Sequence, residues 1–388
     1  MRTVHVVVPD SVDDPTRPSG GNTYDRRVCT GLEALGWSVE VHRVTGRWPH
    51  PEADSLAGLT RTLALMPRDA VVLVDGLVAA GHPDLLVPAS RSLRLVVLVH
   101  LPLGHPVAAG GRVGPAAGAE RRVLEAATAV LTTSRWTANW LLAAYGLRPE
   151  RLHVARPGVD RAQPATGTAS GTALLDVAAV VPAKGHLELV DALASLKDRS
   201  WRLVCAGALD VDPDHVARVR DRCREVGIAG RVSFPGPLVG GPLDRAYAAA
   251  DLVVVPSRIE TYGLVVTEAL ARAVPVVARA VGGLEEAMGE VPGWGRPGLL
   301  VPSAPDDRAA PASSALAEAL RAWLDDRLLR DRLRAVARAR RTALSPWSET
   351  ALRVSDVLAA VVDRPSTGLS GARAGSSLDS ARVDGVRR

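Results

Sequence analysis

The feature that most restricts the fold of this chain is an alternation of short apolar runs with longer segments of helical periodicity. The runs are mostly continuous, which is typical of strands buried on both faces. In the first part of the chain they predict strands over residues 4–8, 38–44, 70–74, 93–100 and 129–133. Helices are predicted between them over residues 21–35, 55–66 and 136–145. Strands and helices in this order form a parallel sheet with helices on both faces.

A second series of the same kind follows a segment without periodicity. Residues 160–172 are rich in Gln, Pro, Thr, Ser, Gly and Ala, a composition typical of a linker between domains. Beyond it, strands are predicted over residues 174–181, 201–206, 231–234, 251–256 and 275–278. The helices predicted among them cover residues 184–196, 214–226, 262–271 and 314–323. A length of 388 residues also exceeds what one compact core usually organises.

These patterns predict an α/β protein with two Rossmann-like, doubly wound domains that face a cleft. We assign residues 1–165 to the first domain and residues 172–345 to the second. An amphipathic helix follows over residues 346–363, and we expect it to complete the first domain. Residues 364–388 are rich in Ser, Gly, Arg and Asp and have few bulky apolar side chains, so we expect a disordered tail.

Charge, cysteine content and hydropathy make several classes of protein unfavourable. The formal net charge of +5 is small for this length and spread among carboxylates, so nucleic acid is not an expected partner. The three cysteines lack the spacing of a metal or redox motif, which favours a reducing, cytoplasmic location. The apolar run at residues 4–8 is too short for a signal peptide. No stretch reaches the roughly 18 to 20 apolar residues of a membrane span.

Two arginine clusters leave peripheral contact with a membrane open. Arg121 and Arg122 form the first cluster, and Arg338, Arg340 and Arg341 form the second. We interpret both as solvated helix faces. The alternative is a basic face that binds the anionic inner surface of a membrane bearing a lipid acceptor.

The most informative segment covers residues 256–270. It leaves the carboxyl end of a predicted strand, passes through a short loop and opens a helix at about Tyr262. Ligands of open α/β sheets bind at such turns. The free N–H groups at Gly263 and Leu264, which Val265 follows, are suited to a diphosphate.

Two carboxylates bracket this turn. Glu260 precedes the helix and suits the hydroxyls of a sugar, whereas Glu268 lies about two turns farther in and suits both hydroxyls of a ribose. The pair resembles the Glu-x7-Glu signature of retaining GT-B glycosyltransferases in glycosyltransferase family 4, also described as glycosyl transferases group 1. Two glutamates at this spacing also occur as solvated residues at helix ends, so the surrounding sequence must decide between the two interpretations.

The resemblance extends over nearly the whole chain. Five further segments match the family pattern in order, at residues 230–236, 250–257, 275–278, 282–286 and 298–301. Two positions depart from it. Ala179 stands where the family usually has an arginine that binds phosphate, and Ala273 stands where it commonly has glycine.

The family resemblance implies roles for residues outside this segment. Lys184 matches a phosphate-binding lysine, His100 matches a histidine near the donor sugar, and Gly20 and Gly21 match the loop that admits donor phosphate and acceptor. The candidate catalytic residues are His100, Lys184 and Glu260. The donor-binding candidates are Gly20, Gly21, Lys184, Glu260, Tyr262, Gly263, Leu264, Val265 and Glu268. The alternatives are a surface lysine, a structural histidine and an ordinary strand-to-helix turn.

The reaction that the resemblance implies is a metal-independent, retaining transfer of a hexose-type sugar from a UDP- or GDP-sugar, without a separate cofactor. The expected acceptor is a small molecule, a glycan or a lipid-linked glycan. Asp210 and Asp212 resemble the metal-binding Asp-x-Asp of another glycosyltransferase architecture, and we interpret them as part of a polar loop. Two alternatives stay open: a nucleotide-sugar epimerase or hydrolase of the same fold, and a non-catalytic nucleotide-sugar-binding protein.

Overall fold

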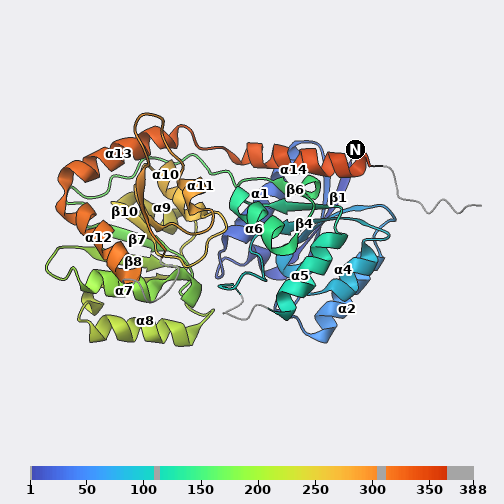
Figure 1. The fold of residues 1–388 in the computed structure, drawn as a ribbon, viewed down its shortest axis with the longest axis horizontal. Helices are drawn as coiled ribbons and strands as arrows, with labels where there is room; N and C mark the ends of the chain where they lie inside the picture. Colours follow the sequence, from blue (N-terminus) through green and yellow to red (C-terminus); the bar gives the residue numbers. More distant parts are fainter. Residues whose placement is uncertain (1, 109–113, 304–311, 365–388) are drawn as a thin grey trace, which may run out of the picture.

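A computed structural model describes residues 2–108, 114–303 and 312–364, which form two parallel six-stranded sheets (Figure 1). The first sheet has the order β2-β1-β3-β4-β5-β6. Its strands are β1 (Thr3–Pro9), β2 (Ser38–Val44), β3 (Val71–Asp75), β4 (Arg94–Val99), β5 (Ala129–Thr132) and β6 (Leu152–Val154). The sequence predicted all of these strands except β6, which is short and has no long apolar run.

The second sheet has the order β12-β11-β10-β7-β8-β9. Its strands are β7 (Ala173–Val177), β8 (Arg202–Ala206), β9 (Val232–Gly236), β10 (Leu252–Val255), β11 (Val276–Arg279) and β12 (Gly298–Val301). Each sheet changes winding direction once, between β1 and β3 in the first and between β7 and β10 in the second. Ligands of doubly wound sheets bind beside the carboxyl ends of the strands at such points.

Helices cover both faces of each sheet (Figure 1). The first domain contains α1 (Gly20–Ala34), α2 (Ala53–Ala64), α3 (Gly76–Ala79), α4 (Pro83–Ala89), α5 (Pro115–Ala126) and α6 (Arg135–Tyr145). The second contains α7 (His186–Ala194), α8 (Pro213–Glu225), α9 (Gly241–Ala249), α10 (Leu264–Ala271), α11 (Leu284–Met288), α12 (Ala312–Asp325) and α13 (Arg327–Arg341). The last helix, α14 (Trp347–Val362), returns to the first domain.

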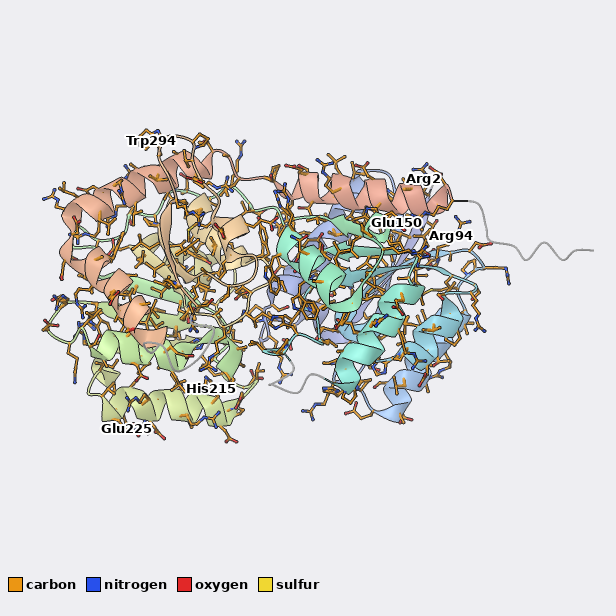
Figure 2. The ribbon with its side chains drawn as sticks, in the orientation of Figure 1. Arg2, Arg94, Glu150, His215, Glu225 and Trp294 are labelled. Carbon is orange, nitrogen blue, oxygen red and sulfur yellow. The ribbon has the colours of Figure 1, made fainter. Side chains whose placement is uncertain are left out.

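The packing of α14 explains this return. Its apolar residues Val354, Leu358 and Val361 are buried in the same core as the side chains of α1 and one face of β1. Arg94 lies near the carboxyl end of this helix (Figure 2). Its guanidinium donates hydrogen bonds to the carbonyls of Val361 and Val362, at 2.8 and 2.7 Å. The chain therefore crosses between the domains twice, and the second crossing is fixed by burial at its far end.

The arginines of α13 correct one interpretation from the sequence. Arg340 donates a hydrogen bond to the Met288 carbonyl at 3.1 Å, and Arg341 donates to the carbonyls of Ala271 and Ala162 at 2.8 and 2.6 Å. These two side chains therefore bind the ends of neighbouring segments, and describing them as solvated was wrong. The predicted disorder of the tail concerns residues 365–388, which lie outside the described residues, and Arg364 alone falls within them.

The position of Ala273 gives a physical reason for the glycine that is common there in the family. Ala273 has φ 57°, directly after α10, and the Val274 N–H closes the helix end on the Ala269 carbonyl at 2.9 Å. A left-handed residue at this place ends many helices, and glycine adopts that conformation without the penalty of a side chain. This chain accepts the cost with alanine, the smallest side chain that has a Cβ.

The contact between α1 and α14 generates a stability prediction. A Cβ on Gly31 would lie 2.4 Å from the Cβ of Ala351, so Gly31→Ala forces the two helices apart and is expected to lower the free energy of unfolding by about 1–3 kcal/mol. Gly58 is a matched control within α2, because a Cβ there meets nothing within 4 Å. Gly58→Ala is expected to raise stability by about 0.5–1 kcal/mol. Urea denaturation measures both changes, and equal effects at the two positions would contradict the close packing of α14.

Candidate functional site

Most of the predicted site residues lie on loops that follow the strands beside the two changes of winding. In the first domain the glycine loop follows β1, which lies at the change, and His100 follows β4, one strand beyond it. In the second, Lys184 follows β7 and Glu260 follows β10. Parallel strands bring their carboxyl ends to one edge of a sheet, so segments far apart in the sequence meet there.

The loop before α10 has a backbone that only glycine adopts easily. Gly263 has φ 95° and is the N-cap of the helix, so α10 begins at Leu264, two residues later than predicted. Gly282 and Gly283 pack directly against this loop. The Gly283 N–H donates a hydrogen bond to the Glu260 carbonyl at 2.8 Å, and a Cβ on Gly282 would lie 1.6 Å from the same oxygen. Any side chain at residue 282 would therefore displace the loop that carries Glu260.

Lys184 and Glu260 form an ion pair between the Nζ and Oε1 atoms. The Ser257 hydroxyl donates a second hydrogen bond to the same carboxylate oxygen, at 3.0 Å. Lys184 lies in a 3-10 turn (Pro182–Lys184) just before α7, not within that helix as predicted. The side chains of Lys184 and Glu260 are 28% and 15% exposed, so the pair is partly shielded and still open to a ligand.

Glu268 is held by a residue that sequence reasoning missed. The Tyr247 hydroxyl, on α9, donates a hydrogen bond to Glu268 Oε2 at 2.8 Å. Burial raises the pKa of Glu268, while the bond from Tyr247 and the charge of Arg272 oppose that rise. The Arg272 guanidinium lies 4.6 Å from the centre of the Tyr247 ring. Nothing in the local sequence of α9 connects Tyr247 to a glutamate 21 residues away.

The glycine loop of the first domain faces the opening of α10. A Cβ on Gly20 would lie 3.2 Å from Leu264 Cδ1, and one on Gly21 would lie 3.3 Å from the His100 ring. Ser19 caps α1 by accepting a hydrogen bond from the Asn22 N–H at 3.0 Å. The amino ends of α1 and α10 thus approach each other across the two domains, and both carry partial positive charge.

His100 belongs to a buried cluster with two carboxylates. Its Nε2–H donates to Asp25 Oδ1 at 2.9 Å, and Asp75 lies in the same group. Burial opposes protonation of His100, but the charge and hydrogen bond of Asp25 and the charge of Asp75 raise the pKa of His100 to about 9. Burial and the charge of Asp25 raise the pKa of Asp75 to about 7. Neither aspartate was a candidate from the sequence, because no motif marks them.

Contacts between the domains use charged side chains near the site. Arg17, two residues before the cap of α1, pairs with Asp210 of the second domain at 2.9 Å. On another side Glu286 pairs with Arg156 and accepts a hydrogen bond from the Arg135 N–H at 2.9 Å. Asp212 caps α8 by accepting from the His215 N–H at 2.9 Å. The two carboxylates of the Asp-x-Asp look-alike are therefore engaged in an ion pair and a helix cap.

Two arginines, one from the loop after β10 and one from β11, contact the segment that carries Lys184 and the start of α7. The Arg258 N–H donates to the Ala183 carbonyl at 2.8 Å, one residue before Lys184. The Arg258 side chain donates to Glu188 at 2.6 Å, and the buried Arg279 lies 3.8 Å from the same carboxylate. Arg258 is half exposed, which leaves it able to turn toward a bound anion.

Three groups of described side chains bring at least three metal-ligating atoms within 4.8 Å of one another. One is the cluster of Asp25, Asp75 and His100. The second group is fully buried and consists of Asp176, His186 and Cys205. The third group lies on the first sheet and consists of His5, Glu40 and His42. In the first group His100 and Asp25 are paired with each other, with 2.9 Å between His100 Nε2 and Asp25 Oδ1.

Sequence comparisons agree over both halves of the chain. Residues 18–163 match the family described as Glycosyltransferase Family 4, and residues 169–340 match Glycosyl transferases group 1. D-inositol 3-phosphate glycosyltransferase 1 of Catenulispora acidiphila is 33% identical over 344 residues, which cover 82% of this chain and 78% of that protein. This chain is a family 4 glycosyltransferase. The corresponding protein of Kineococcus radiotolerans is 36% identical over 269 residues, which cover 63% of this chain and 60% of that one.

Solved structures have the same fold as this glycosyltransferase. A sucrose-phosphate synthase from Thermosynechococcus elongatus matches with a TM-score of 0.75 and 22% identity, over 93% of this chain and 99% of that one. Anabaena HepE in complex with UDP-glucose matches with a TM-score of 0.73 and 19% identity, over 93% of this chain and all of that one, 100%. The predicted GT-B fold is confirmed. Within its described residues, the glycosyltransferase has no helix whose length and apolar character would let it cross a bilayer.

The charge state of His100 provides a prediction for this glycosyltransferase. Its pKa of about 9 exceeds the ordinary value of 6.5, so protonated His100 stabilises the fold fully below pH 6.5, and this contribution is lost as the pH rises through 9. In Asp25→Asn the pKa of His100 is expected to fall below its wild-type value, because the charge of Asp25 no longer opposes the effect of burial and only the charge of Asp75 remains to raise the pKa. NMR titration of the histidine ring measures both values. Asp54→Asn, on the exposed start of α2, is the control, and a His100 titration midpoint unchanged by Asp25→Asn would contradict the pairing.

Proposed function

We propose that this glycosyltransferase transfers a hexose-type sugar from a UDP- or GDP-sugar to a hydroxylated acceptor with retention of the anomeric configuration. The observation that carries the proposal is the approach of Gly20 to Leu264, where a Cβ on Gly20 would lie 3.2 Å from Leu264 Cδ1, beside the pair formed by Lys184 and Glu260. This arrangement gathers two helix amino ends and one cation where the two domains meet. Such a set of donors suits the diphosphate of a nucleotide sugar.

Each part of the donor has a matching group. The diphosphate is assigned to the N–H groups at Gly263 and Leu264 and to Lys184, whose ammonium then exchanges part of its contact with Glu260 for phosphate oxygens. The ribose is assigned to Glu268, because the bond from Tyr247 holds one carboxylate oxygen and leaves the other to accept from hydroxyls. Glu260 and His100 are assigned to the transferred sugar.

The chemistry needs positive charge where the leaving diphosphate develops negative charge. The amino ends of α1 and α10 supply it without rearrangement, and Lys184 supplies it once its ammonium has exchanged part of its contact with Glu260 for phosphate oxygens. Fixed dipoles and cations stabilise a transition state in this way. Arg258 is our candidate for the second cation that Ala179 does not provide. In a retaining transfer of this kind the acceptor attacks from the face that the leaving group vacates, and the phosphate oxygen takes the acceptor proton. No protein nucleophile is assigned.

Metal independence is part of the proposal. It is supported by the cationic side chains and helix amino ends that meet between the two domains. These groups would neutralise the charge of the diphosphate, as Mg²⁺ does in other architectures. It is also supported by the contacts of Asp210 and Asp212, since an ion at these carboxylates would have to displace the bond with Arg17 and the cap of α8.

The acceptor is expected to bind on the first domain, beside His100. The names of the related enzymes make D-inositol 3-phosphate the first acceptor to test. The imidazolium of His100 favours acceptors with electron-rich hydroxyls or an anionic group near the reacting oxygen. Glycans and lipid-linked glycans belong in the same panel, with liposomes at low and high salt to detect membrane contact.

The test combines donor selection with product analysis. A thermal-shift screen of UDP-, GDP- and ADP-sugars identifies the donor, because a ligand selective for the folded state raises the melting temperature. Proton NMR of the product with each acceptor then gives the anomeric configuration. An inverted product would disprove retention. Donor consumption without acceptor would favour a hydrolase or epimerase, and donor binding without turnover over the whole panel would favour a non-catalytic binder.

The two lysines of the chain form a matched pair for testing the phosphate role. Lys184→Ala is expected to lower kcat by about 10²- to 10³-fold with a smaller change in KM, since its charge acts mainly on the leaving group. Lys197 is exposed and donates to the Val226 carbonyl at 3.0 Å, so Lys197→Ala is expected to retain the wild-type rate. Steady-state kinetics with the selected donor measures both. Similar rates in the two variants would remove Lys184 from the mechanism.

Tyr247→Phe tests how Glu268 is held. Loss of the 2.8 Å bond is expected to weaken donor binding by about 3- to 10-fold, the usual net value of one hydrogen bond, without the large loss of kcat expected for Lys184→Ala. Tyr145→Phe is the matched control, because it breaks a Tyr-to-Glu bond of 2.5 Å in the first domain. Calorimetry with the nucleotide diphosphate compares the two. Equal affinities in Tyr247→Phe and the wild type would contradict the assignment of Glu268 to the ribose.

A further inference from the structure

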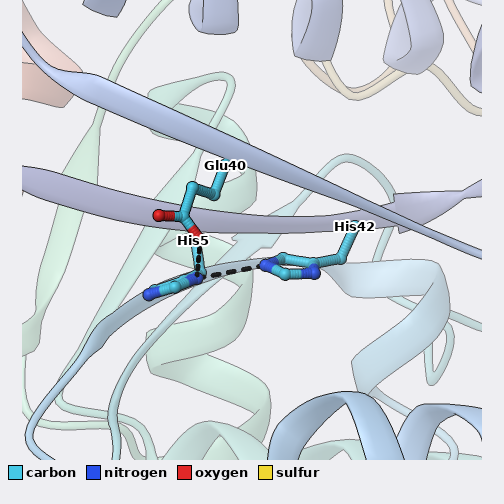
Figure 3. A group of neighbouring side chains, drawn as sticks. All are labelled: His5, Glu40 and His42. Carbon is cyan, nitrogen blue, oxygen red and sulfur yellow. Dashed lines mark hydrogen bonds and ion pairs between the residues drawn. The ribbon is translucent and has the colours of Figure 1, made fainter. Parts of the chain in front are cut away.

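A group of three side chains outside the proposed site projects from neighbouring parallel strands (Figure 3). His5 on β1 pairs in register with Glu40 on β2, and His42 lies two residues farther along β2, so its side chain points to the same face as that of Glu40. His5 Nδ1 lies 3.1 Å from His42 Nε2 and 3.2 Å from Glu40 Oε2. One ring nitrogen therefore faces an imidazole nitrogen and a carboxylate oxygen together.

These distances suit a tetrahedral metal ion. Zinc ligands lie about 2.0–2.1 Å from the ion, so two nitrogen or oxygen ligands of a tetrahedral site are about 3.3–3.4 Å apart. The two measured separations are within about 0.3 Å of that value, and the three donor atoms all lie within 4.8 Å of one another. A single proton on His5 Nδ1 satisfies one neighbour at a time, whereas one ion satisfies the lone pairs of all three.

The surroundings also favour a cation with an open ligand position. The three side chains line a hollow of about 480 Å³ together with Thr62, Leu65 and Met66 from the last turn of α2 and the residues after it. The carboxyl end of a helix carries partial negative charge. The His5 side chain is 9% exposed and is held by its neighbours, whereas the Glu40 side chain is 54% exposed and is reached by water.

We propose that His5, Glu40 and His42 form a binding site for a divalent transition-metal ion, with Zn²⁺ as the best match and water as its fourth ligand. Imidazole and carboxylate donors are typical zinc ligands, and hard ions such as Mg²⁺ prefer all-oxygen sites. The proposed site joins the edge strand β2 to β1 and lies on the amino half of β1, whereas the proposed reaction uses loops beyond the carboxyl ends of the strands. The ion is therefore expected to stabilise the sheet edge and to take no part in sugar transfer.

The test uses the full chain after treatment with a chelator. Calorimetric titration with zinc chloride is expected to give one tight site per chain, and the melting temperature is expected to rise with zinc concentration. Cobalt chloride is expected to produce the visible absorption of a tetrahedral cobalt centre. Glu40→Gln keeps the shape of an exposed side chain and removes one charged ligand, so it is expected to fold normally and bind zinc at least about 10-fold more weakly. His42→Ala is expected to lose the cobalt spectrum.

Controls separate this site from other zinc ligands. His50→Ala, in the exposed loop after β2, is expected to bind zinc as the wild type does. Sugar-transfer activity of Glu40→Gln is expected to match that of the wild type with and without zinc, so a failure of the metal site is distinguishable from a failure of the proposed function. Wild-type zinc affinity in both Glu40→Gln and His42→Ala, or an absence of one-to-one binding in the wild type, would overturn the proposal.

Discussion

The change of winding direction in each parallel sheet is the constraint on which the other features of this protein depend. At each change the connecting loops leave the carboxyl ends of adjacent strands toward opposite faces of the sheet, so they cannot fill the space between them. In the second sheet the two loops that leave this point carry Lys184 and Glu260, whose ion pair joins them. In the first sheet the corresponding loops carry the glycine pair and Asp75. The position of the candidate site therefore follows from strand order and does not depend on the identity of the side chains.

The two domains meet through contacts that differ in strength. Burial of α14 against α1 fixes the second crossing of the chain with apolar packing, which does not depend on salt or pH. The pairs formed by Arg17 with Asp210 and Arg156 with Glu286 are partly exposed, and such pairs contribute little free energy, about 0–1 kcal/mol each. This combination keeps the domains together, and a change in the angle between them costs little free energy. Closure of two domains over a substrate needs such freedom.

Charge in the site is balanced before any ligand binds. Lys184 has Glu260 as its partner, His100 has Asp25, and the buried oxygen of Glu268 has the hydroxyl of Tyr247. Leaving one member of such a pair alone in a partly buried place would cost several kcal/mol, which explains why each reactive group has a companion. In the proposed reaction, the same pairing means that the diphosphate of the donor competes with Glu260 for Lys184. The arrangement thereby favours ligands that bring more negative charge than a single carboxylate.

The sequence by itself determined the features that depend on residues close together in the chain. Periodicity over five to fifteen residues gave most strands and helices, and the spacing of Glu260 and Glu268 around Gly263 marked the helix opening, because each of these signals is local. The sequence patterns missed the short strand β6 and placed the start of α10 too early. Tertiary contacts decide where such weakly patterned elements begin and end. Only the tertiary structure decided the partners: Asp25 with His100, Tyr247 with Glu268, and His5 with Glu40 and His42. These contacts follow from strand order, register and helix packing, which no local spacing records.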